Sequence, residues 1–525
     1  MAASGSRLSE EMTMLNVRTA LRRSAAYHLD RVAIVAEGAE LTYGQAWERG
    51  TRLANALLSA GLRPGDRVAV LEDNCLASTD LFLATAIANL VRVPLYARNS
   101  RESHAHMLHR AGCRALVVAA DHAHEIDGLA AELPDLDRVV VRGPDYESWL
   151  AGFPADDPDV IIDPDDPYVI RHSAGTTGKS KGIVFSHRAW LNTERNWTFL
   201  LPPLELGDHC IHVAPISHGS GYLFLPCWLA GGVNVLEPRF DPARVVDLLT
   251  SLGGYVFGVP TMIADLVASE AAASLGPEDF ASVKAFVVSG APITPKTALA
   301  AHDLIGPRLY QLYGQTECVP AAFMGPHEWF ADVPGSDPLR SCGRVMPYAE
   351  LEIRDHDNRS LPVGHSGEIA IRSDGQMVGI WDDPDTTALR LVNGWVLTGD
   401  IGRLDANGFL YLQGRKDDML ISGGFNIWPT ELEAVIAALP GVREVVVFGV
   451  PHERWGETPV AIVVHDPAHP ISEADVVETC RARLGSYKKP TVIQIQTDAL
   501  ERSPLGKISR SQLRARFLAG QRTSA

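Results

Sequence analysis

The strongest constraint on the fold is the alternation of helix-like stretches with short, continuously apolar strands. Residues 43–61, YGQAWERGTRLANALLSAG, place apolar side chains such as Leu53 and Leu57 at helical spacing and end at Gly61. A turn then leads into the apolar run VAVLE at 68–72. Because strands that are apolar along their whole length are buried on both faces, this rhythm predicts a parallel sheet covered by helices, which is an α/β fold.

The same rhythm continues along the chain. Helix-like stretches precede the apolar runs VRVPLY at 91–96 and ALVVAA at 115–120, and the pattern returns in VKAFVVSGAPIT at 283–294. After Gly414 short strands alternate with two helices, one of which begins at PTELE, where we expect Thr430 and Glu433 to form a capping box. We therefore predict a large N-terminal α/β domain over 1–416 and a small α+β domain over 417–525.

Composition excludes several classes of function. The net charge is −17, from 47 basic and 64 acidic residues, so the chain repels phosphate backbones, and we expect no nucleic-acid partner. No apolar run reaches about 18 residues and no signal peptide opens the chain, which predicts a cytoplasmic protein without a membrane partner. Seven scattered cysteines fit reduced thiols. The sequence is compatible with a homodimer but does not determine the oligomeric state.

The stretch SAGTTGKSKG, residues 173–182, resembles the end of a Walker A phosphate loop. Two features argue against that reading. Ser173 stands where the Walker loop has its first glycine, and the flanking runs YVIRHS and KGIVFSH both read as strands, which predicts a hairpin in place of a strand followed by a helix. Its small residues and hydroxyls still suit a loop whose N–H groups wrap an anion, although a β-turn without a ligand is an alternative.

Four further motifs follow in a characteristic order: YGQTE at 313–317, TGD at 398–400, GRKDDMLISGGFNIWPTELE at 414–433 and SPLGK at 503–507. Together with SAGTTGKSKG they resemble the adenylate-forming superfamily, in particular its acyl- and aryl-CoA synthetases of the benzoate type. The resemblance implies a large domain followed by a small, mobile one. It also implies that a carboxylic acid is activated with ATP and Mg²⁺ to acyl-AMP and pyrophosphate, and that the acyl group then passes to coenzyme A.

The resemblance assigns residues to the nucleotide. The phosphate loop is implied to comprise Ser173, Gly175, Thr176, Thr177, Gly178 and Lys181. Ala174 and Ser180 stand where the family commonly has Ser and Pro. The adenine and ribose contacts are implied to be Gly290, Ala291, Pro292, Tyr313, Gly314, Asp400 and Arg415. The residues implied to act on the reacting groups are Thr316 at the α-phosphate, Glu317 as the Mg²⁺ ligand and Lys507 between the carboxylate and the α-phosphate. A lone carboxylate suits Mg²⁺, which keeps phosphate oxygens as its other ligands.

The second half-reaction requires a rearrangement, because the thiol must reach the carbonyl where Lys507 would stand. The resemblance implies that the small domain rotates about a hinge at Asp417. It also implies a tunnel and nucleotide site for coenzyme A, formed by Gly423, Gly424, Trp455, Tyr487 and Lys489.

The acyl pocket is implied to lie at PISHGSG, residues 215–221, with His218 as its gate and as a catalytic residue. Its apolar wall is predicted to include Tyr222, Phe257 and Val259. Amino-acid-activating relatives usually place an Asp there, and this chain has none, so we expect a neutral aromatic, alicyclic or medium-chain acid. Three hypotheses remain open: an acid–CoA ligase, an adenylating enzyme that serves a carrier-protein thiol or an amine, and a nucleotide-binding regulator with an inactive centre.

Overall fold

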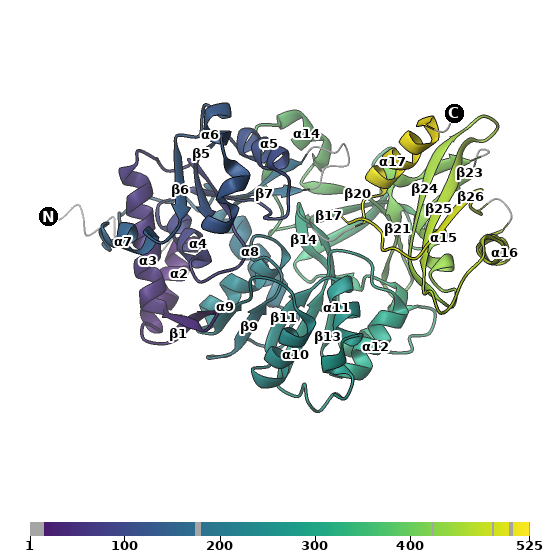
Figure 1. Ribbon diagram of the computed structural model, residues 1–525, viewed down its shortest axis with the longest axis horizontal. Coiled ribbons are helices and arrows are strands. Elements are labelled where there is room, and N and C mark those ends of the chain that lie inside the picture. The colour runs from purple at the N-terminus through teal and green to yellow at the C-terminus, as the bar shows by residue number, and fades with distance from the viewer. Residues whose placement is uncertain (1–14, 174–179, 423–424, 486–487, 503–507, 524–525) are drawn as a thin grey trace. The chain divides into compact units, whose positions relative to one another are not determined.

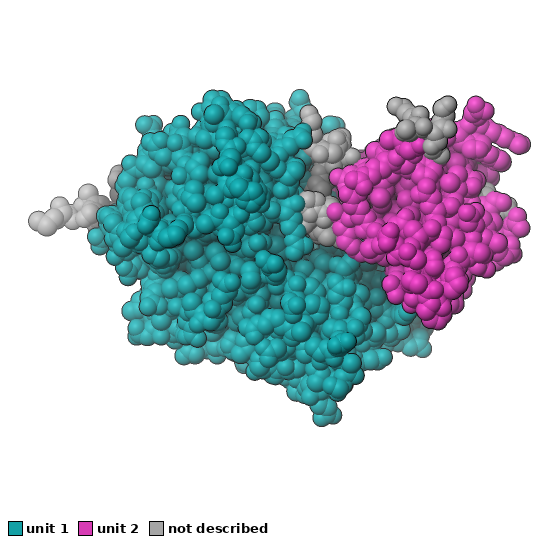
Figure 2. All heavy atoms as spheres, viewed as in Figure 1, with its two compact units in different colours: residues 1–351, 370–397, 407–410 teal, residues 352–369, 398–406, 411–525 magenta. Residues whose placement is uncertain are grey.

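The computed structural model describes residues 15–173, 180–422, 425–485, 488–502 and 508–523 (Figure 1). The chain divides into two compact units, coloured separately in Figure 2. We call residues 1–351, 370–397 and 407–410 the larger unit, and residues 352–369, 398–406 and 411–525 the smaller unit. The predicted domain boundary at residue 416 stays a prediction.

The predicted alternation of helices and buried strands is confirmed. The first elements of this series are α3 (Tyr43–Ser59), β3 (Arg67–Leu71), α4 (Ser78–Ile87), β4 (Val91–Pro94), α5 (Arg101–Ala111) and β5 (Cys113–Ala119). Strand β3 pairs in parallel with both β4 and β5. Helix α3 begins at a capping box formed by Thr42 and Gln45, which fixes its first turn.

These strands belong to a seven-stranded sheet with the order β18-β8-β7-β4-β3-β5-β6. Its remaining strands are β6 (Arg138–Arg142), β7 (Pro167–Ser173), β8 (Lys181–Ser186) and β18 (Gly379–Ile380). Strands β7 and β8 form an antiparallel hairpin in which Ser173 lies opposite Lys181. The predicted hairpin geometry around SAGTTGKSKG is therefore confirmed, and the stretch is no Walker A loop.

A second, nine-stranded sheet has the order β15-β14-β13-β12-β11-β9-β10-β1-β2. Its strands are β1 (Val32–Ala36), β2 (Ala39–Thr42), β9 (His209–His212), β10 (Val233–Leu236), β11 (Gly254–Gly258), β12 (Val283–Val288), β13 (Leu309–Gln315), β14 (Cys318–Met324) and β15 (Arg344–Val345). The pairings from β1 to β13 are parallel, and β14 returns antiparallel to β13. The carboxyl ends of the parallel strands consequently share one edge, where α/β proteins commonly bind ligands.

Helix α8 (His187–Thr198) packs against both sheets of the larger unit, because it contacts β7 and β8 of one and β14 of the other. Two of its side chains, Trp190 and Trp197, are fully buried. The helices α2 (Val17–Tyr27) and α9 (Phe224–Ala230) pack against it. An interior helix with two buried tryptophans supplies a rigid, aromatic boundary for any site beside it.

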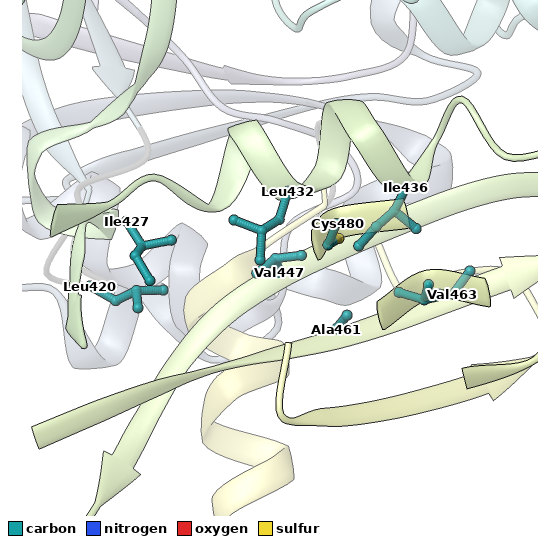
Figure 3. Packing of buried hydrophobic residues seen from close by; sticks show 9 residues of the cluster. Leu420, Ile427, Leu432, Ile436, Val447, Ala461, Val463 and Cys480 are labelled. Atoms are coloured by element: carbon teal, nitrogen blue, oxygen red, sulfur yellow. The ribbon is translucent and has the colours of Figure 1, made fainter. Parts of the chain in front are cut away.

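The smaller unit contains an α+β core, as predicted. Its sheet consists of β22 (Leu420–Ser422), β23 (Phe425–Ile427), β24 (Val442–His452), β25 (Gly456–His465) and β26 (Val492–Gln496). Figure 3 shows Leu432 and Ile436 of α15 (Pro429–Ile436) beside Val447, Ala461 and Val463 of the two long strands. Cys480 of α16 (Glu473–Leu484) completes this cluster. A further sheet, with the order β16-β17-β20-β19 and β21 paired to β20, comprises β16 (Ala349–Arg354), β17 (Gly367–Ser373), β19 (Leu391–Val392), β20 (Trp395–Leu404) and β21 (Leu410–Arg415).

The predicted capping box at Thr430 and Glu433 is wrong. Helix α15 begins at Pro429, with Trp428 as its N-cap and no side-chain cap. The Thr430 hydroxyl donates to the carbonyl of Gln413, and the Glu433 carboxylate accepts from the backbone of Val447. Proline at the first helical position has no N–H that a cap would have to satisfy. The side chains of Thr430 and Glu433 instead bond to backbone groups that are distant along the chain.

All seven cysteines are free thiols, and every one except Cys75 is buried. Within the described stretches of the chain, no helix combines the length and the apolar character that crossing a membrane requires.

One buried ion pair of the larger unit provides a test of the packing. Asp80 of α4 is fully buried and accepts two hydrogen bonds from Arg49 of α3, both at 2.8 Å, and one from the Tyr146 hydroxyl. Removing one partner of such a pair leaves a buried charge uncompensated. We expect Asp80→Ala to lower the free energy of unfolding by about 3 kcal/mol, measured by urea denaturation.

The control is Glu48→Ala, which breaks the neighbouring but solvent-exposed pair with Arg52. That pair should contribute less than about 1 kcal/mol. Equal losses in the two variants would contradict the role assigned to Asp80.

Candidate active site

The β13–β14 turn carries the predicted catalytic pair. Tyr313 and Gly314 lie in β13, and Thr316 and Glu317 form the turn before β14. A Cβ at Gly314 would lie 2.8 Å from the carbonyl oxygen of Cys318 and from Val319, so only glycine fits this close approach. The Glu317 residue is only 6% exposed. The tight turn therefore places one nearly buried carboxylate at the end of the strand.

The ends of the predicted phosphate loop lie in the seven-stranded sheet of the larger unit. Ser173 ends β7 and Lys181 begins β8. The other predicted loop residues, Gly175, Thr176, Thr177 and Gly178, lie outside the described residues. The hairpin register alone thus sets where this loop leaves and re-enters the sheet.

A short segment joins these two regions. Gln376 forms an isolated antiparallel bridge with Cys318, and the Met377 N–H donates to the Glu317 carbonyl at 2.8 Å. Two residues later β18 pairs with β8, with Gly379 opposite Val184. Backbone hydrogen bonds therefore hold the Glu317 turn of one sheet to the strand that begins with Lys181 in the other.

Helix α14 (Pro384–Arg390) continues this segment and presents a charge at each end. Its N-cap, Asp383, accepts from Thr386, and these hydrogen bonds lower the pKa of the carboxyl group, with smaller contributions from the charges of Arg110 and Lys181. At its last residue, Arg390 lies with Nη2 3.6 Å from Oε1 of Glu317. This helix was not predicted, since nothing in TTALR resembles a recognised motif.

The predicted adenine-binding segment lies at the neighbouring strand end. Gly290, Ala291 and Pro292 follow β12 and are exposed, and Gly290 adopts a φ of +90° that favours glycine. Strand β12 pairs in parallel with β13, with Val288 opposite Gln311. The segment and the buried Tyr313 therefore emerge at the same carboxyl edge of the sheet.

The predicted ribose contacts, Asp400 and Arg415, lie together in the smaller unit. The Arg415 Nε donates to Oδ1 of Asp400 at 2.6 Å, and the backbone N–H of Asp400 donates to the Thr398 hydroxyl at 3.0 Å. The Asp400 carboxylate is nearly buried, and a carboxylate offers about four acceptor sites, so one that accepts from a guanidinium is also suited to accept from hydroxyl groups. This donor set fits a vicinal diol such as the ribose of ATP.

The predicted acyl-pocket residues form one aromatic group in the larger unit. The Tyr222 ring stacks on Trp197 and on Trp190, with centroids 4.7 and 5.3 Å away. Phe257 meets Trp197 edge-on at 5.7 Å, and a Cβ at Gly219 would lie 2.4 Å from the Phe257 ring. Only glycine at 219 therefore lets the loop lie against this wall.

The remaining two predicted pocket residues lie close to Phe257 and Gly219 along the chain. Val259 follows β11 and is half-buried, and His218 precedes Gly219 with its ring edge-on to Tyr96 at 5.0 Å. The Arg171 guanidinium lies over the Tyr222 ring at 4.4 Å. Arg171 was not among the predicted residues.

Two buried polar residues, neither of them predicted, hold the loop that carries His218. The Asn74 amide nitrogen donates to three carbonyls, including those of His212 and Ala214, and its oxygen accepts from the Ile216 N–H at 2.9 Å. His212 contacts Ser220 and Asn234 at 2.8 Å, and burial lowers its pKa to about 4, so the ring is neutral. An Asn two residues after the apolar run VAVLE at 68–72 was the available signal.

The predicted coenzyme A residues are only partly described. Gly423, Gly424 and Tyr487 lie outside the described residues, as does the predicted catalytic Lys507. Trp455 lies between β24 and β25 and is 42% exposed, with the Arg454 guanidinium 5.0 Å from its ring. Lys489 is half-buried, and the hinge candidate Asp417 is exposed. An exposed indole beside a cation offers a surface for an apolar, anionic ligand.

The turn geometry generates a test that needs no knowledge of the acid. We expect Gly314→Ala to leave the protein folded but to weaken ATP binding at least tenfold, because the added Cβ displaces Thr316 and Glu317. Calorimetric titration with ATP and Mg²⁺ measures the loss. Gly325→Ala is the matched control, since the nearest atom to a Cβ there lies at 3.5 Å. Equal affinities in the two variants would show that the turn does not contact the nucleotide.

Comparisons with known proteins agree with this geometry. Residues 21–381 match the family model of the AMP-binding enzymes, and residues 431–507 match the AMP-binding enzyme C-terminal domain. A fatty acid–[acyl-carrier-protein] ligase of Streptomyces coeruleorubidus is 31% identical, over 92% of this chain and 93% of its own length. A feruloyl-CoA synthase of Amycolatopsis sp is 32% identical, over 91% and 94%.

The fold is likewise that of solved family members. ATP-bound MatB of Rhodopseudomonas palustris superimposes with a TM-score of 0.86 at 28% identity, covering 96% of this chain and 99% of its own. The large α/β region and the smaller C-terminal α+β region predicted from the sequence are thereby confirmed. The chain belongs to the AMP-binding enzyme family, within the CoA-ligase branch of the adenylate-forming superfamily.

Proposed function

We propose that the protein is an AMP-forming acid–thiol ligase, which converts a carboxylic acid and ATP into acyl-AMP and pyrophosphate and then transfers the acyl group to coenzyme A. One observation carries the proposal. The segment at 376–380 is hydrogen-bonded to Glu317 at one end and to β8 at the other, so the predicted metal ligand and the strand of the phosphate loop are held as one unit.

Adenylation brings two anions together, so the site must supply positive charge and oriented donors where charge develops. In our proposal Lys181 faces the phosphates, Thr316 donates to the α-phosphate and Tyr313 lies against adenine. Glu317 would hold Mg²⁺, which offsets phosphate charge when it is bound. Lys507 would bridge the carboxylate and the α-phosphate.

Transfer to the thiol requires Lys507 to leave the carbonyl. We propose that residues 417–525 rotate about Asp417, whose exposed position within the 3₁₀ turn Lys416–Asp418 suits a residue that changes its backbone angles. Trp455 and Lys489 then contribute to the coenzyme A site. A thiol with a pKa near 8.5 is partly ionised at neutral pH, so attack on the mixed anhydride needs no strong base.

The aromatic wall supports a neutral acid as the substrate. Tyr222 and Phe257 are nearly fully buried and face an interior of tryptophans, so an aromatic, alicyclic or medium-chain acyl group would be desolvated there. The named feruloyl-CoA synthase is a relative that acts on an aromatic acid. Free thiols throughout support the cytosol as the proposed location, and a homodimer is the proposed assembly.

The second candidate is an adenylating enzyme whose acceptor is a carrier-protein thiol or an amine. A specific observation favours it, because a relative that matches along nearly the whole chain is named as a ligase of an acyl carrier protein. Against it stands Trp455, which matches the tryptophan of the coenzyme A tunnel in the aryl-CoA ligases. Both candidates share the adenylation step and differ only in the acceptor.

Two assays test the proposal in sequence. Acid-dependent exchange of pyrophosphate into ATP, measured across a panel of carboxylic acids, should reveal activity with neutral aromatic or alicyclic acids. Consumption of free coenzyme A with the best acid then separates the two candidates. Silence across the whole panel would instead favour a nucleotide-binding regulator.

The role of Lys507 gives a sharper prediction. Lys507→Ala should abolish exchange yet retain thioester formation from supplied acyl-AMP, because the lysine acts only in adenylation. Lys296→Ala, an exposed lysine on α12 (Pro295–Ile305), should retain both reactions. If Lys507→Ala lost both half-reactions to the same extent, the assigned role would be wrong.

A further inference from the structure

Ser180 closes the predicted phosphate loop, directly before Lys181 begins β8, and its own side chain does not hold it in place. The Ser180 hydroxyl oxygen is buried and, within the part of the chain that the structure describes, has no hydrogen-bond partner. Ser180 stands where the family commonly has proline, whose ring would fix the φ angle of this residue. If the loop is to be rigid at this point, the restraint has to come from another element.

Helix α5 supplies such a restraint through His106. The His106 Nε2 lies 3.2 Å from the carbonyl oxygen of Ser180, which is within hydrogen-bonding distance. A carbonyl oxygen only accepts, so the Nε2 of His106 carries the proton and donates. The Ser180 carbonyl and the Lys181 N–H belong to one planar peptide unit, so this hydrogen bond also orients the backbone where β8 begins.

Helix α5 is a firm support for this contact, because both of its ends are fixed. The side chain of Ser100 caps its first turn, and at the other end the Arg67 side chain donates to the carbonyl of Ala111 at 2.9 Å. The helix also packs against both β5 and β8. A helix held in this way keeps His106 in place beside β8, and His106 in turn holds Ser180.

We propose that His106 is a positioning residue for the triphosphate, which keeps Ser180 and Lys181 in the conformation in which Lys181 faces the phosphates of ATP. This inference rests on the proposed function. The hydrogen bond acts as the proline ring would, since either one lowers the conformational entropy that residue 180 loses when the loop closes on an anion. Thr316 is the proposed contact of the α-phosphate, so AMP, which lacks the other two phosphates, should bind independently of His106.

The first test compares affinities for ATP and for AMP, both with Mg²⁺, by calorimetry. His106→Ala should weaken ATP binding about fivefold, the effect of one lost hydrogen bond, and should leave AMP binding within about twofold of the wild type. His106→Gln should restore part of the loss, because its amide can donate to the same carbonyl. Should His106→Ala fold poorly, His106→Asn takes its place, since the shorter amide does not reach. Equal losses for ATP and AMP would overturn the inference.

Ser180→Pro tests whether His106 acts through this residue. The substitution removes an unpartnered hydroxyl and fixes φ, so alone it should tighten ATP binding by up to about fivefold. In this background His106→Ala should change ATP affinity by less than about twofold, because the ring already restrains residue 180. An undiminished effect of His106→Ala in the proline background would overturn the inference. A proline variant that lost ATP binding would do the same, since the restrained conformation would then not be the binding one.

The matched control is His109→Ala, which removes an exposed histidine three residues further along α5 and should bind both nucleotides like the wild type. The inference is overturned if His106→Ala behaves like His109→Ala while the wild type binds ATP. A wild-type protein that binds neither nucleotide would instead refute the proposed function, and this inference with it.

Discussion

The backbone hydrogen bonds of residues 376–380 are the interaction on which the candidate site depends. One end of this segment bridges to Cys318 and donates to Glu317, and the other end pairs with β8. The two sheets of the larger unit contribute different parts of the predicted ATP site, the phosphate loop and the Glu317 turn. The predicted site requires both parts. Backbone pairing is well suited to joining them, because its geometry does not depend on side-chain rotamers.

The same segment explains why charge is distributed as it is around the site. Helix α14 presents the Asp383 carboxylate toward Arg110 and Lys181 and presents the Arg390 guanidinium toward Glu317. Glu317 and Lys181 therefore each have an opposite charge in their surroundings before any ligand arrives. Such pairing reduces the cost of keeping charged groups partly buried.

The acyl side of the site is built on a different principle. Trp190 and Trp197 of α8 stack on Tyr222, and buried Asn74 and His212 hold the loop that carries His218. Close packing gives the wall a fixed shape, and the buried hydrogen bonds give the loop a single conformation. Discrimination between acids would then arise from shape and desolvation. A methylene group gained or lost against such a wall changes affinity only modestly, so discrimination by size alone would be weak.

The sequence by itself determined the α/β fold class, the hairpin around residues 173–181 and the family, because periodicity, turn residues and motif order are local properties of the chain. The capping box at Thr430 and Glu433 was wrong because distant partners, Gln413 and Val447, competed for those side chains. Only the tertiary structure decided that Arg390, Asn74 and Arg171 lie beside Glu317, the His218 loop and Tyr222. These neighbours are at least 51 residues apart along the chain. No local pattern encodes such contacts, since sheet pairing and helix packing alone bring them together.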